Sequence, residues 1–157
     1  MGDINRPEGD NLGGILRFKF IDVNDVLSIA LPINSAILST VQLKPGKSWS
    51  SGYGTLETIG YSEPGEITDA GTIYKRMFVA FCPYENAYSD DLLHIMRNRQ
   101  FLVDYTNANG VRKLIGSINE PLFFLGALNT KTKSSDLAGY SISFFSDSSH
   151  KAYVYSG

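Results

Sequence analysis

Short segments with the period-two pattern of β-strands, separated by turn residues about every eight to twelve positions, are the feature that most limits how this chain can fold. In the first segment, Leu16, Phe18 and Phe20 fall on one face and Arg17 and Lys19 on the other, as in a half-buried strand. About nine or ten such segments, with little helical pattern between them, are typical of sandwiches and barrels. The sequence therefore predicts a mainly β fold: a single-domain β-sandwich or barrel with one flanking α-helix.

The predicted strands differ in length and hydrophobicity. Residues 71–83 form the longest and are apolar enough for a central strand. Residues 34–43 fit either a short helix or a strand, and Thr40 and Val41 favour the strand because β-branched side chains suit it. Residues 44–72 are expected to be mainly a polar loop. Further strands are predicted at residues 26–30, 101–105, 111–115, 122–128, 140–145 and 152–155.

One helix is predicted after residue 88. Ser89 is a candidate N-cap, Asp90 and Asp91 suit the positive end of the helix dipole, and Arg97 and Arg99 suit the negative end.

A hairpin turn is predicted at Asn109 and Gly110. Asn-Gly favours the primed turns that join antiparallel strands, and apolar segments lie on both sides of it.

Composition sets the size and class of the protein. A chain of 157 residues that is 43% hydrophobic and carries a net charge of −2 can form one core and lacks the signature of disorder. We expect residues 1–13, rich in glycine and polar side chains, to form a flexible arm, and residues 14–157 to form a single β-rich domain. The charge offers no broad field for capturing nucleic acid, so no specific nucleic-acid binding is expected.

Side chains suited to catalysis or metal binding are few and scattered. Cys82, His94 and His150 share no ligand spacing, and no phosphate-loop or nucleophile-elbow motif occurs. We therefore predict no catalytic residue, no metal, no cofactor and no enzymatic activity. A single cysteine excludes an intrachain disulfide, which fits a reducing compartment. No segment has the length of a membrane span or the pattern of a secretory signal, so no membrane association is expected.

Three aromatic residues are candidates for an interface or a ligand contact. Trp49 and Tyr53 lie near glycines and could offer stacking surfaces to a sugar, and Tyr74 lies in the long strand. Packing in the core and contact between subunits are equally open for these side chains, because aromatic residues are enriched in both.

The C-terminal half resembles small structural proteins of tailed bacteriophages and prophages. The resemblance rests on the strand VRKLIGS (Val111–Ser117), the turn at Asn119–Pro121 and the segment Ser134–Tyr140 that opens a final meander. The resemblance covers about half of the chain. The proteins that this half resembles are tail-tube, tail-terminator and neck-ring subunits. It implies a β-sandwich or barrel with one helix that forms a homo-oligomeric ring or tube beside neighbouring tail or neck proteins. It also implies a location in the virion, after a period in the host cytoplasm before assembly.

Two other functions stay open from the sequence. A carbohydrate-binding or adhesin-like sandwich would use Trp49 and Tyr53 as its platform. An enzyme with an unrecognised site is the third possibility.

Overall fold

The computed structural model describes residues 13–83, 86–133, 136 and 138–157. The arm predicted for residues 1–13 therefore lies outside the described residues, apart from Gly13. The elements in chain order are β1 (Ile15–Asp22), the 3-10 turn η1 (Val23–Asp25), β2 (Val26–Ser28), β3 (Ala36–Ile37), β4 (Gln42–Leu43), β5 (Ser50–Gly52), β6 (Gly60–Ser62), β7 (Gly65–Thr68), β8 (Gly71–Pro83), α1 (Ala87–Met96), β9 (Gln100–Asn107), β10 (Arg112–Ile115), β11 (Leu122–Asn129), β12 (Gly139–Ser148) and β13 (Tyr153–Tyr155).

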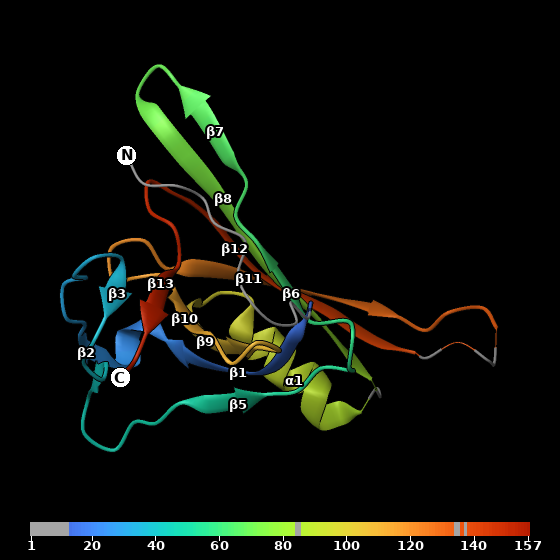
Figure 1. The fold of residues 1–157 in the computed structure, drawn as a ribbon. Helices are drawn as coiled ribbons and strands as arrows, with labels where there is room; N and C mark the ends of the chain where they lie inside the picture. Colours follow the sequence, from blue (N-terminus) through green and yellow to red (C-terminus); the bar gives the residue numbers. More distant parts are fainter. Residues whose placement is uncertain (1–12, 84–85, 134–135, 137) are drawn as a thin grey trace.

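Most strands belong to one mixed sheet (Figure 1). Its main path runs β3-β13-β10-β9-β11-β12-β8-β6, with β1 on β9, β5 on β1 and β7 on β8. Among the described residues, only β3 and β13 pair in parallel, and β2 with β4 makes a small second sheet. The predicted mainly β fold with one helix is confirmed, and the strands of the described residues form no closed barrel.

The main core lies where β1 and β9 pack over β8, β12 and β11. Phe18 of β1 lies 4.9 Å from Phe78 of β8, measured between ring centroids, and Phe101 of β9 lies 5.6 Å from Phe144 of β12. A second apolar cluster covers the other side of β9 and β10, so these strands are buried on both faces. The buried residues of this second cluster are Ile21, Val26, Ile37, Val41, Leu102, Leu114 and Tyr155. Burial on both faces explains the consecutive apolar residues 101–103 of β9 and 114–115 of β10.

The single helix closes one end of the main core. Met96 is buried in the core and Leu93 packs against it. The N-cap is Asn86, whose side-chain oxygen accepts the backbone N–H of Ser89 at 2.9 Å. The prediction of Ser89 as N-cap is wrong, because Asn86 is an equally suitable capping residue three positions earlier and starts the helix there.

Two further predictions need correction. Leu16 is 60% exposed, whereas Ile15 is buried, because the pairing of β1 with β9 shifts register between Ile15 and Arg17. Such a bulge turns the following side chain to the other face. The region 44–72, expected to be mainly loop, contains β5, β6 and β7. Their sequences are short and polar and do not show the apolar alternation of a strand. Backbone pairing of β5 with β1, and of β6 and β7 with β8, makes them strands.

Candidate functional site

The three aromatic candidates from the sequence make no ring contact with one another in the part of the chain that the structure describes. Trp49 is partly buried and packs against the second apolar cluster, whereas Tyr53, just after β5, is 70% exposed. Tyr74 is half-buried on β8, and the Lys151 ammonium lies 5.4 Å from the centre of its ring. Part of the Trp49 side chain is therefore covered by packing, and Tyr53 has the most accessible ring of the three.

The predicted turn joins β9 to β10. The backbone N–H of Gly110 donates to the carbonyl of Asn107 at 3.0 Å, and Gly110 has a φ of 79°, which glycine adopts without strain. The Asn107 side chain accepts the N–H groups of Asn109 and Val111. These contacts are local, so the turn serves to set the register between the two strands.

The outward side of β8, β12 and β11 carries exposed apolar side chains in register. Met77, Phe145 and Phe123 lie in one row across the three strands, and Val79 and Leu125 flank Ser143 in the next row. Phe123 is 50% exposed, Leu125 57% and Met77 47%. We call Met77, Val79, Phe123, Leu125 and Phe145 the outer face. Water contacts this much apolar surface only at a cost, and such patches mark contact sites.

A hollow opens at one end of the outer face. It has a volume of about 490 Å³, and Phe123 and Phe145 form part of its wall together with Gln100, Asn119, Glu120, Pro121, Ser146 and Asp147. A side chain from a partner could enter this space while its neighbours cover the outer face.

Two hairpins extend away from the packed body in different directions (Figure 1). One is formed by β7 and the first half of β8, where Ile67 is 89% exposed. The other is formed by the paired ends of β11 and β12. Projecting hairpins with exposed apolar side chains are suited to reach a neighbouring molecule.

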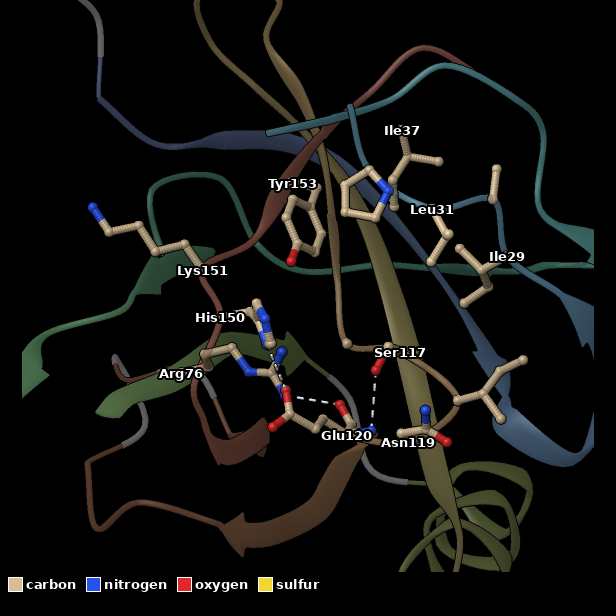
Figure 2. A pocket seen from close by; sticks show the side chains of 14 residues that line it. Ile29, Leu31, Ile37, Arg76, Ser117, Asn119, Glu120, His150, Lys151 and Tyr153 are labelled. Atoms are coloured by element: carbon tan, nitrogen blue, oxygen red, sulfur yellow. Dashed lines mark hydrogen bonds and ion pairs between the residues drawn. The ribbon is translucent and has the colours of Figure 1, made fainter. Parts of the chain in front are cut away.

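A larger cavity of about 580 Å³ lies between the segment that follows β2, the connection from β10 to β11, and the residues before β13. Its polar side chains come from three distant parts of the sequence: Arg76 on β8, Ser117 to Glu120 after β10, and His150 and Lys151 after β12. Figure 2 shows Arg76, His150 and Lys151 on one side and Ile29, Leu31 and Ile37 across from them. We call this space the Arg76 cavity.

Glu120 sits in a hydrogen-bond network at the edge of this cavity. Its carboxylate accepts from the hydroxyls of Ser148 and Ser149, and His150 Nδ1 lies 3.4 Å from it. Burial acts to raise the pKa of Glu120, but the hydrogen bonds from Ser148 and His150 and the charge of Arg76 outweigh it, so the pKa is lowered. The carboxylate is therefore ionised at neutral pH.

This network does not have the division of roles found in a catalytic triad. Ser149 Oγ lies 2.9 Å from His150 Nδ1, the same ring nitrogen that faces Glu120. In a triad the serine and the acid contact different ring nitrogens, so that the imidazole can carry a proton between them. The Ser149, His150 and Glu120 arrangement is better suited to holding the loop before β13.

The guanidinium of Arg76 is buried beneath the same cavity. Arg76 is 3% exposed, and its Nη2 donates to Ser146 Oγ at 2.7 Å and to the carbonyl of Glu120 at 2.8 Å. Burial lowers the pKa of Arg76, although an arginine stays charged under all ordinary conditions. No carboxylate of the described residues lies within ion-pair distance of it.

A second polar group, around the partly buried Glu63, joins distant segments of the chain. Glu63 accepts from the Tyr61 hydroxyl and from the backbone N–H of Ala152, each at 2.8 Å, and the ring of Tyr61 lies 5.4 Å from that of Tyr105. Burial, with the nearby charge of Glu63, raises the pKa of Tyr105 to about 12. Burial and the hydrogen bond to Glu63 also raise the pKa of Tyr61.

These tyrosines predict a loss of stability in alkali. A raised pKa in the folded state means that the neutral phenol is favoured by folding, so the stabilisation is complete below pH of about 10, where tyrosine ionises in the unfolded chain, and is lost as pH rises above it. We expect the free energy of unfolding to fall by about 1 kcal/mol or more per pH unit there, measured by urea titration at successive pH values. Tyr105→Phe should reduce this slope, because it removes one of the two phenols whose pKa is raised. Equal slopes in the parent and Tyr105→Phe would contradict the prediction.

The sequence contained only part of the signal for these features. Part of the outer face is visible in hindsight in residues 71–83, where Met77 and Val79 alternate with Phe78 and Ala80, a pattern that we interpreted as a central strand. The Arg76 cavity had no local signal, because its polar residues lie more than seventy positions apart between Arg76 and His150. Only the pairing of β8 with β12 brings them together.

The described residues contain no group of three or more potential ligands placed to hold a metal ion. Among them, no helix has the length and apolar character required to cross a membrane. Comparison of the chain with family models, with curated proteins and with solved structures finds no match.

Proposed function

We propose that this chain is a structural subunit of a tailed-phage or prophage virion that assembles with further copies of itself into a ring or tube of the tail or neck. The observation that carries the assembly part is the outer face. Exposed aromatic and aliphatic side chains in register across three central strands are typical of a surface that is covered in the assembled state. The hollow beside Phe123 and Phe145 would receive a side chain of the next copy.

The phage part of the proposal rests on the resemblance of the C-terminal half to tail and neck proteins. The two projecting hairpins support it, because a subunit in a ring must reach its neighbours on both sides. The partners are further copies and the adjoining tail or neck proteins, and the location is the virion after assembly in the host cytoplasm. Genes for terminase, portal or capsid proteins beside the coding gene would support this assignment, as would the protein's detection by mass spectrometry in purified virions.

The assembly proposal is tested by placing charges on the outer face. Phe123→Lys with Leu125→Lys puts two ammonium groups where apolar contact is proposed, and each should weaken association by roughly 2 kcal/mol or more. We expect the parent to elute as a multi-subunit species in light-scattering chromatography and to form rings or tubes in negative-stain images. The double variant should be monomeric at the same concentration.

The matched control is Leu56→Lys, since Leu56 is 72% exposed in the turn before β6 and lies off the outer face. It should assemble as the parent does. All variants should give parental circular dichroism, because the changed side chains point away from the core. A parent that stays monomeric at high concentration, or a double variant that assembles normally, would overturn the proposal.

A further inference from the structure

The hollow at the end of the outer face is lined by aromatic and acidic side chains. The rings of Phe123 and Phe145 lie 6.2 Å apart, measured between their centroids, and are tilted by 38° to each other. The acidic residues Glu120 and Asp147 line the same hollow. Aromatic rings attract a cation through their electron-rich faces, and carboxylates attract it through their charge. The chemistry of the hollow therefore favours a positively charged side chain.

Asp147 carries the negative charge that is available to a partner. Its side chain is exposed and has no ion-pair partner among the described residues. Lys75 lies opposite Asp147 in the pairing of β8 with β12, but the Lys75 ammonium pairs with Glu66 at 2.8 Å. Glu120 already accepts hydrogen bonds from its own chain. Asp147 is therefore the carboxylate of the hollow that remains for another molecule.

The opposite end of the same two strands carries the complementary charge. Lys131 and Lys133 follow β11, are exposed and have no ion-pair partner in the described part of the chain. Asp136 lies in the same connection, so the described charges there, two lysines and one aspartate, sum to +1. This end of β11 and β12 extends away from the packed body (Figure 1). We call residues 131–133 the basic tip.

The basic tip cannot reach the hollow of its own chain. The register of β11 with β12 runs from Phe123 opposite Phe145, beside the hollow, to Asn129 opposite Gly139, near the tip. Six residues of extended strand span about 20 Å. The two strands are paired throughout this length, which holds the two ends apart. Opposite charges at the two ends of one paired ribbon can therefore meet only between different molecules.

We propose that the basic tip of one copy binds in the hollow of the next copy. The aliphatic stem of a tip lysine lies against the rings of Phe123 and Phe145, and its ammonium pairs with Asp147. Lysine suits this position because its stem can cover apolar surface while its charged end stays with a carboxylate. The inference rests on the proposed assembly and adds which parts of two copies meet. Because the contact joins two different surfaces, further copies can add head to tail.

Reversing the charge at each end tests the contact. Lys131→Glu with Lys133→Glu reverses the tip, and Asp147→Lys reverses the hollow. Each of these two variants should associate about tenfold or more weakly than the parent in light-scattering chromatography, because like charges then face each other.

Mixing the two variants in equal amounts should recover assembly. The unchanged tip of one variant meets the unchanged hollow of the other, and the reversed tip meets the reversed hollow, so every contact again joins opposite charges. Recovery on mixing also shows that both variants are folded, which parental circular dichroism should confirm.

The matched controls are Lys44→Glu and Asp91→Lys. Both residues are exposed and lie outside the outer face and the basic tip, and the substitutions make the same changes of charge. Each control should assemble alone as the parent does.

Three results would overturn the proposal: normal assembly of the tip-reversed variant, no recovery on mixing, or a parent that stops at a dimer. If Phe123→Lys with Leu125→Lys abolishes assembly while the charge reversals do not, the proposed assembly stands and this contact is wrong. A parent that stays monomeric at high concentration overturns both.

Discussion

Phe144→Ala should lower the free energy of unfolding by about 3–5 kcal/mol, the range for truncating a fully buried aromatic side chain. Phe144 has no exposed surface and lies at the centre of the aromatic core. Its ring centroid is 5.1 Å from that of Phe124, 5.6 Å from Phe101 and 5.8 Å from Phe20. Truncation removes all of these contacts and leaves a cavity that the surrounding strands cannot fill. Chemical denaturation followed by circular dichroism measures the loss.

The neighbouring residue provides the control. Phe145 follows Phe144 directly but points to the outer face and is only partly buried. Phe145→Ala should therefore cost roughly 1 kcal/mol in monomer stability, while weakening association if the assembly proposal holds. Equal losses in the two variants would mean that the assignment of inner and outer faces on β12 is wrong.

Arg112→Met should lower the free energy of unfolding by about 2–4 kcal/mol, because it leaves a buried carboxylate without its cation. The Asp104 side chain is 4% exposed and accepts from Nε of Arg112 at 2.8 Å. The guanidinium also lies 4.4 Å from the centre of the Tyr155 ring. The Arg112 side chain is 36% exposed, so water partly screens the pair and the loss should stay below the largest values for buried pairs.

A more exposed ion pair allows the same substitution to be compared. Arg99 lies 3.2 Å from Asp22, and the side chains of the two residues are 52% and 10% exposed, against 36% and 4% for Arg112 and Asp104. Arg99→Met should therefore cost less than about 1 kcal/mol. Adding Asp104→Asn to Arg112→Met removes the uncompensated charge and should recover part of the lost stability. If the double variant is no more stable than Arg112→Met alone, packing by Arg112, and not its charge, explains the loss.

The sequence predicted the long local elements well. The bounds of β8 were predicted correctly as residues 71–83, because thirteen residues rich in aromatic and β-branched side chains have few alternatives to a strand. The hairpin of β9 and β10 was equally clear, because its turn chemistry is local. The helix was found but started too late, since Asn86 and Ser89 both have suitable capping side chains and the sequence does not rank them.

The features that could not be predicted from the sequence depend on pairing between distant segments. β3 has only two residues, and its strand character comes from parallel pairing with β13. The exposure of Leu16 results from a bulge in the pairing of β1 with β9, and the local sequence pattern does not predict this bulge. The Arg76 cavity has the same origin, because its polar side chains meet only when β8 and β12 align. Predicting such features therefore requires knowledge of which strands pair and in which register.

The pairing of β3 with β13 also determines when the fold can be completed. Residues 36–37 can form their strand pairing only after residues 154–155 are present. The Val41 backbone N–H also donates to the Tyr155 hydroxyl, across a separation of 114 positions. Contacts between such remote positions slow folding, because a long loop must close before they form. During synthesis the second apolar cluster therefore stays incomplete until the last strand has left the ribosome. A nascent chain would expose Ile37 and Val41 throughout that interval, so these side chains would be open to binding by a chaperone until residues 153–155 are in place.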